Sequence, residues 1–155
     1  MNRICIIGVY FGNLPEYFNL WLKTCQTNPE IDFLLFTDSV LTELPGNVKC
    51  HITTLKDIKK TAAKLLGFPV SLETPYKLCD YKPVYGLLFQ SYLSEYDYWG
   101  HCDFDMFFGD LMYFFKEYHL DEYDRFNALG HLSLYRNTDE VNHRYQCDGG
   151  HYDYK

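Results

Sequence analysis

Two apolar runs near the N-terminus constrain the fold of this chain more than any other feature. Ile4–Tyr10 and Ile31–Phe36 are continuous stretches rich in β-branched and aromatic residues. Such runs are typical of strands that are buried on both faces of a parallel sheet. Between them, residues 16–24 carry apolar side chains at helical spacing. This order predicts a strand, a helix and a second strand that belong to a mostly parallel sheet.

The segments that follow continue the alternation of strand and helix. Val48–Ile52 predicts a third strand, and a capping box of Thr54 and Asp57 opens a helix that Gly67 ends. Further along, the pattern predicts a buried helix over 84–93 that starts at Pro83 and a buried strand up to Asp103 and Asp105. Asp110 then caps a short helix over 111–115, the alternative being that Asp110 is a third metal ligand. A strand over 127–135 follows, and then a helix capped by Asn137 or Thr138 that ends near Tyr145. We therefore expect a single α/β domain over residues 1–155.

An acidic pair lies at the end of the predicted fourth strand. Asp103 and Asp105 follow an aromatic stretch and are separated by Phe104. In an extended chain, residues two apart share a face, so we expect both carboxylates to point the same way. Two close carboxylates repel each other, and a bound Mn²⁺ or Mg²⁺ relieves that repulsion through oxygen ligation. The alternative is a strand that ends in a solvated acidic turn, since a bare Asp-x-Asp is common by chance.

A lysine-bearing segment precedes the predicted helix start at Pro83. Lys77, Asp80 and Lys82 lie within this segment, and a helix start flanked by lysines is suited to phosphate. The alternative is a pair of solvated lysines around a loop in which Asp80 is a local cap. Asp38 follows the second predicted strand, so it belongs to the same carboxyl-end edge of the sheet as the acidic pair, where ligands of α/β proteins bind.

The composition narrows the classes of partner. The formal net charge is −7, and no Lys/Arg cluster exceeds the short run from Lys56 to Lys64. This balance argues against nucleic acid and against strong attachment to anionic lipid, and leaves at most weak peripheral membrane association. Six cysteines without a Cys-x-x-Cys pair favour free thiols in a reducing cytoplasm. The first apolar run is too short for a transmembrane segment, so we expect a cytoplasmic protein.

Together these segments resemble the GT-A glycosyltransferases, and most closely bacterial capsular and lipopolysaccharide biosynthesis transferases with a Lys-x-Cys-Asp-Tyr-Lys-Pro segment ahead of an Asp-x-Asp motif. Residues 77–83 read Lys-Leu-Cys-Asp-Tyr-Lys-Pro, and residues 103–105 supply the Asp-x-Asp. The resemblance covers residues 1 to about 145 and is most specific over residues 77–110. It implies a GT-A-like, Rossmann-type α/β/α sandwich. It also implies a metal-dependent transferase of polysaccharide biosynthesis that moves a sugar from a nucleotide diphosphate donor, a UDP-sugar, to a glycan or lipid-linked acceptor.

The resemblance also implies roles for individual residues. The nucleotide-sugar would be held by Tyr10, Phe11, Asp38, Lys77, Asp80, Lys82 and Phe104, of which Tyr10, Phe11 and Asp38 would face the nucleobase and ribose. Asp103 and Asp105 would hold Mn²⁺ or Mg²⁺ at the diphosphate. His131 is a possible extra ligand, although a lone histidine is more often a hydrogen-bonded structural residue. No residue is assigned as catalytic base.

The carboxyl end departs from the family pattern, because such enzymes are usually much longer. We therefore expect residues 1–155 to be the N-terminal, donor-binding part of a longer protein, truncated at the C-terminus. A rival class, the haloacid-dehalogenase-like phosphatases, places Asp-x-Asp on the first strand with Thr or Val two residues after the second Asp. Here Phe107 occupies that place. A further alternative is a non-catalytic nucleotide-sugar or glycan-binding module whose acidic pair is structural.

Overall fold

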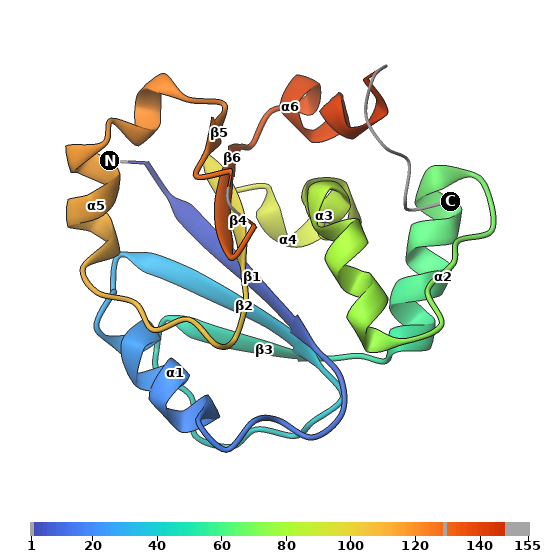
Figure 1. The fold of residues 1–155 in the computed structure, drawn as a ribbon, viewed down its shortest axis with the longest axis horizontal. Helices are drawn as coiled ribbons and strands as arrows, with labels where there is room; N and C mark the ends of the chain where they lie inside the picture. The colour runs from blue at the N-terminus through green and yellow to red at the C-terminus, as the bar shows by residue number, and fades with distance from the viewer. Residues whose placement is uncertain (1, 129, 148–155) are drawn as a thin grey trace.

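A six-stranded mixed sheet forms the centre of the protein in this computed structural model, which describes residues 2–128 and 130–147 (Figure 1). The strands are β1 (Ile4–Tyr10), β2 (Ile31–Thr37), β3 (Val48–Ile52), β4 (Tyr98–Cys102), β5 (Arg125–Phe126) and β6 (Leu132–Arg136). Their spatial order is β3-β2-β1-β4-β6-β5. The first four strands are parallel, whereas β6 is antiparallel to both β4 and β5. The predicted α/β class with a mostly parallel sheet is therefore confirmed.

Helices cover both faces of the sheet (Figure 1). The helical segments are α1 (Phe18–Gln26), α2 (Leu55–Leu66), the 3₁₀ helix η1 (Pro75–Val84), α3 (Tyr85–Leu88), α4 (Gln90–Leu93), α5 (Leu111–Glu117), η2 (Leu120–Glu122), α6 (Asp139–His143) and η3 (Arg144–Gln146). One buried cluster joins α1 and α5 to the sheet, and a second joins α2, η1, α3 and α6 to the opposite face. Alternate residues of β1 enter the two clusters, because successive strand side chains point to opposite faces.

Local capping signals explain where several helices begin and end. The Thr54 side chain accepts from the backbone N–H of Asp57, and Gly67 ends α2 with a left-handed φ of 77°. Asp110 caps α5 through the N–H of Tyr113. Thr138, rather than Asn137, caps α6 through the N–H of Val141. These caps were readable from the sequence because each depends on residues within one helical turn.

Two predicted elements have the wrong bounds. The helix expected over 84–93 is instead a 3₁₀ helix over Pro75–Val84 followed by the short helices α3 and α4. Pro83 lies inside this helical segment, where it lacks a backbone N–H and is incompatible with a regular α-helix running through it. The expected amino end of an α-helix at Pro83 is therefore absent from this described segment. Lys82 projects from the 3₁₀ helix instead.

The single strand expected over 127–135 is also wrong. The chain forms β5 and β6 as an antiparallel pair, with the turn between them beyond Phe126. Positive φ angles of 56° at Asn127 and 89° at Gly130 redirect the chain there. His131 consequently precedes β6 and lies outside its strand. Expectations about the end of the chain, residues 148–155, lie outside the described residues.

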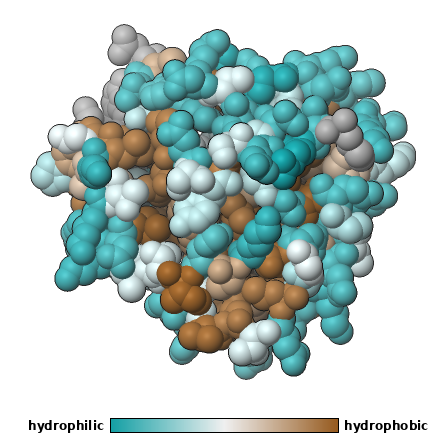
Figure 2. Space-filling view, turned by 180° about the vertical axis from the view of Figure 1, so that it is seen from behind, coloured by the Kyte–Doolittle hydropathy of each residue, from teal (hydrophilic) through white to brown (hydrophobic). Residues whose placement is uncertain are grey.

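The surface mixes polar and apolar side chains. Figure 2 shows the face behind that of Figure 1, where hydrophobic residues gather near the centre and at the lower edge among hydrophilic ones. Large exposed side chains include Tyr17, Leu20, Tyr76 and Phe107. Over the described residues, none of the helices has the length and apolar character needed to cross a membrane.

Candidate functional site

A cleft of about 650 Å³ opens at the carboxyl ends of β1 and β4. These neighbouring strands lie where the chain order reverses within the sheet, since β2 follows β1 on one side and β4 lies on the other. Such a switch point is where α/β sheets of this kind bind ligands. The cleft is lined by Val9, Tyr10, Phe11, Tyr17, Pro75, Tyr76, Leu78, Cys79, Lys82, Tyr85, Cys102, Asp103, Phe104, Asp105 and His131.

Charged side chains that line the cleft contact one another. Lys82 Nζ lies 2.5 Å from Asp103 Oδ1, and His131 Nδ1 lies 3.1 Å from Asp103 Oδ2. The Lys82 side chain is 16% exposed and that of Asp103 31%, whereas His131 is 71% exposed. Lys82 also donates to the carbonyl oxygen of Gly130 at 3.3 Å. We call the side chains of Lys82, Asp103 and His131 the Lys82–Asp103–His131 cluster. It joins η1, the end of β4 and the start of β6.

The acidic pair lies in a turn after β4 rather than on the strand itself, because β4 ends at Cys102. We expected the two carboxylates to point the same way because they would alternate along a strand, and this reason is wrong. Instead, Phe104 anchors the turn: it is 7% exposed and its ring centroid lies 4.8 Å from that of Trp21. The residues on either side of this buried ring, Asp103 and Asp105, both line the cleft.

Aromatic side chains also line the cleft. Tyr10 ends β1 and Phe11 follows it, and the Tyr10 ring meets Phe104 edge-on with 5.4 Å between the ring centroids. Tyr76, 85% exposed, comes from η1, and Tyr17, 44% exposed, precedes α1. Flat rings with polar tips suit nucleobases and sugars. The sequence interpretation did not include Tyr17, Tyr76, Cys79 or Tyr85 in the site. Signals existed for Cys79, which lies within the segment 77–83, and for Tyr76, which precedes it.

Three predicted residues are not among the described residues that line the cleft. Asp38 accepts a hydrogen bond of 2.9 Å from the N–H of Gly12, so it links the loops after β1 and β2. Lys77 and Asp80 form an ion pair of 2.5 Å with each other on η1. Lys77 and Asp80 are close in sequence to residues that line the cleft, but neither they nor Asp38 line it. Their contacts with a nucleotide-sugar stay predictions.

Burial keeps several titratable groups around the cleft neutral. Burial, aided by the positive charge of Lys82, lowers the pKa of His101 to about 3. Burial also raises the pKa of the Cys102 thiol to about 12 and raises the pKa of the Tyr85 hydroxyl. Charge among the described lining residues is therefore carried by Lys82, the two aspartates and, when protonated, His131.

The donor set of Asp103 and Asp105 suits a hard cation only in part. Residues 2–128 and 130–147 contain no group of three or more His, Cys, Asp or Glu side chains that could hold a metal ion. Two carboxylates are nevertheless enough for Mg²⁺ or Mn²⁺ when substrate phosphates complete the coordination shell. Asp103 and Asp105 thus fit a cation shared with a phosphate ligand, and do not fit one enclosed by protein alone.

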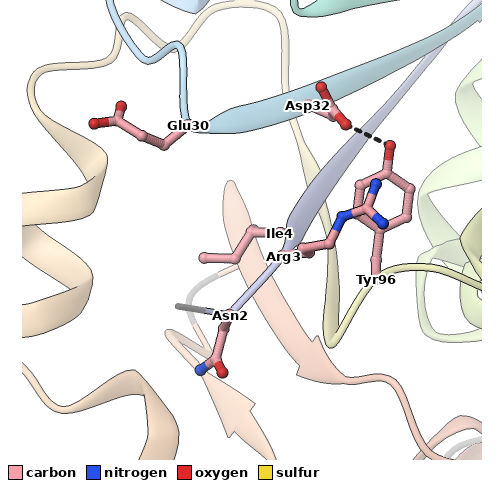
Figure 3. A pocket seen from close by; sticks show the side chains of 6 residues that line it. All are labelled: Asn2, Arg3, Ile4, Glu30, Asp32 and Tyr96. Atoms are coloured by element: carbon pink, nitrogen blue, oxygen red, sulfur yellow. Dashed lines mark hydrogen bonds between the residues drawn. The ribbon is translucent and has the colours of Figure 1, made fainter.

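A second, smaller pocket of about 200 Å³ lies at the opposite, amino ends of β1 and β2 (Figure 3). The Arg3 guanidinium lies 5.2 Å from the centroid of the Tyr96 ring and 2.9 Å from Glu95. The Tyr96 hydroxyl in turn donates to Asp32 at 2.6 Å. These contacts tie the start of β1 to β2 and to the turn before β4. We assign them a structural role.

Comparison with known families places residues 6–155 in one family. The chain matches the family described as "Family of unknown function (DUF6625)" over nearly its whole length, and it belongs to that family. No match to a curated protein is found. The family description names no activity, so function must be argued from the cleft.

Proposed function

We propose that this member of the family is a metal-dependent glycosyltransferase of GT-A type, whose cleft binds a nucleotide diphosphate sugar, a UDP-sugar. The observation that carries the proposal is the composition of one cleft at the switch point of the sheet. Aromatic side chains and Lys82 with two aspartates line this same cleft. A nucleotide diphosphate combines the groups that such side chains bind, a flat base and anionic oxygens.

Each part of the cleft has a task in this proposal. Tyr10 and Phe11 would contact the base and ribose, and Lys82 would donate charge-assisted hydrogen bonds to the diphosphate. Asp103 and Asp105 would hold Mn²⁺ or Mg²⁺, which would neutralise charge on the departing diphosphate. In transfer, the oxygen of the acceptor hydroxyl forms a bond to the anomeric carbon and its proton passes to solvent, while the bond from that carbon to the diphosphate oxygen breaks. The diphosphate keeps that electron pair, and Lys82 stabilises the developing charge.

The proposal is tested by isothermal calorimetry with UDP in the presence and absence of Mn²⁺. Asp105→Asn removes one charge from an exposed turn, so the variant should stay folded but lose Mn²⁺-dependent binding of UDP. Asp121→Asn, an exposed aspartate on η2, is the matched control and should bind as the wild type does. An affinity for UDP that changes neither with Mn²⁺ nor with the Asp105→Asn substitution would refute the proposed site.

A second candidate is a non-catalytic nucleotide-sugar or glycan-binding module. It is favoured by the Lys82–Asp103–His131 cluster, in which both oxygens of Asp103 already have nitrogen partners, as a structural aspartate would. Incubation with labelled UDP-sugars, Mn²⁺ and a panel of glycan acceptors separates the two. Acceptor-dependent release of UDP supports the transferase, and tight binding without turnover or donor hydrolysis supports the binding module.

A further inference from the structure

Lys82 lies where a cation bound to Asp103 would come to rest. Its Nζ is 2.5 Å from Asp103 Oδ1, and His131 Nδ1 is 3.1 Å from Oδ2, so each carboxylate oxygen has a nitrogen partner. The Lys82 side chain is 16% exposed, which shields the pair from water. Such a pair is stronger than one on an open surface.

A divalent cation at Asp103 would meet this ammonium at short range. Like charges at that separation repel, so Lys82 has to leave Asp103 for the metal to bind there. Lys82 also donates to the carbonyl oxygen of Gly130 at 3.3 Å, and this oxygen carries no formal charge. A metal that arrives alone would therefore leave a largely buried ammonium without an anionic partner, at a cost in free energy.

A diphosphate removes that cost. It enters the same cleft that Lys82 lines and offers several anionic oxygens, which accept charge-assisted hydrogen bonds from an ammonium. Lys82 can then exchange one anionic partner for another. Asp103, released by Lys82, would then be available as a ligand for the metal.

We propose that Lys82 is an exchangeable counter-ion, which neutralises Asp103 in the free protein and transfers to a phosphate oxygen when a nucleoside diphosphate and a divalent cation bind together. This inference rests on the proposed function. It makes the binding of metal and diphosphate mutually dependent, so each raises the affinity for the other by the same factor. It also explains how two aspartates can remain close to a lysine without forming a strong site for free metal.

The first test measures Mn²⁺ binding without nucleotide, by the electron paramagnetic resonance signal of free Mn²⁺. Lys82→Met removes the competing ammonium, so its affinity for Mn²⁺ alone should rise by roughly tenfold or more, the equivalent of one charge-assisted hydrogen bond. Its affinity for UDP with Mn²⁺ should fall. Lys64→Met removes an exposed lysine of α2 and is the charge-matched control, with Mn²⁺ affinity as in the wild type. Unchanged or weaker Mn²⁺ binding by Lys82→Met overturns the exchange.

A second variant keeps the proposal open to refutation if Lys82→Met does not fold. Asp103→Asn releases Lys82 and removes a carboxylate that repels phosphate, so UDP binding in excess chelator should become tighter than in the wild type. With Mn²⁺ present, the same variant should bind UDP more weakly. Equal or weaker binding of UDP in chelator would show that Lys82 is not held back by Asp103.

The outcomes separate the two proposals. A wild-type protein that binds UDP with Mn²⁺, but whose Lys82→Met variant gains no affinity for Mn²⁺ alone, retains the proposed function and loses the exchange. A wild-type protein that binds no UDP under any of these conditions loses the proposed function and the exchange that rests on it.

Discussion

Gly8→Ala should disturb the acidic turn from inside the protein, through Phe104, whose side chain also lines the cleft. Gly8 lies in β1, and a Cβ at this position would stand 2.7 Å from Cζ of Phe104. Carbon atoms in contact are normally separated by about 3.5–4.0 Å, so the Phe104 ring has to move by roughly 1 Å. The ring has little room to do so, because it packs against Tyr10, Phe18 and Trp21.

The magnitude follows from two opposing terms. Overpacking a core by one methyl group costs about 1–3 kcal/mol, whereas replacing glycine by alanine stabilises by about 0.4–1 kcal/mol through the unfolded chain. The net expectation is a loss of roughly 1–2 kcal/mol. For a chain of 155 residues this corresponds to a fall in melting temperature of about 2–8 °C. Because Phe104 is flanked by Asp103 and Asp105, Mn²⁺-dependent affinity for UDP should fall as well.

Thermal unfolding followed by circular dichroism, together with calorimetry, measures both effects. Gly46→Ala is the matched control, because no heavy atom lies within 4 Å of the added methyl group; it should show only the stabilisation of about 0.4–1 kcal/mol that comes from the unfolded chain. In the double variant Gly8→Ala/Phe104→Leu, the smaller side chain gives the methyl group space. The double variant should therefore lose less stability than the sum of the losses of the Gly8→Ala and Phe104→Leu single variants. A Gly8→Ala protein with wild-type stability and wild-type UDP affinity would refute the proposed coupling.

Three further predictions concern single side chains. Asn28 is 2% exposed; it donates to the carbonyl oxygens of Thr24 and Gly109 and accepts from the N–H of Leu111. In urea unfolding, Asn28→Ala should lower the free energy of unfolding by about 2–4 kcal/mol. Asn28→Asp should lower it by at least as much, because it sets a buried carboxylate oxygen against two carbonyl oxygens. Lys82→Ala should weaken UDP binding about tenfold or more in calorimetry and leave uridine binding unchanged; equal losses would move Lys82 away from the phosphates. Burial, and to a smaller extent the positive charge of Lys49, lowers the pKa of His51. The unfolded chain therefore binds the proton more readily than the folded protein does. Stability consequently falls as the pH drops through about 6.5, the ordinary pKa of histidine. His51→Phe should therefore lose less stability in urea unfolding between about pH 7.5 and 5.5 than the wild type does, and an identical loss would contradict this sign.

The sequence by itself determined the elements whose causes are local. The apolar runs of β1 and β2 predicted two buried strands, and β3 has the predicted bounds Val48–Ile52. The helix α2 begins and ends where Thr54 and Gly67 predicted, because a cap depends on residues within one turn. The acidic pair could be singled out as candidate ligands for the same reason: it is a short pattern next to a recognisable strand.

Only the tertiary structure decided what surrounds that pair. Lys82 and His131 meet Asp103 across 21 and 28 residues of chain, and no periodicity in the sequence encodes such a distance. The antiparallel return of β6 beside β4 brings His131 to the cleft, through positive φ angles that alternation cannot reveal. Tyr17 and Tyr76 likewise reach one cleft from different layers. Local patterns arise from neighbouring residues, whereas the composition of a site depends on how the whole sheet is ordered and on which loops it brings to the same edge.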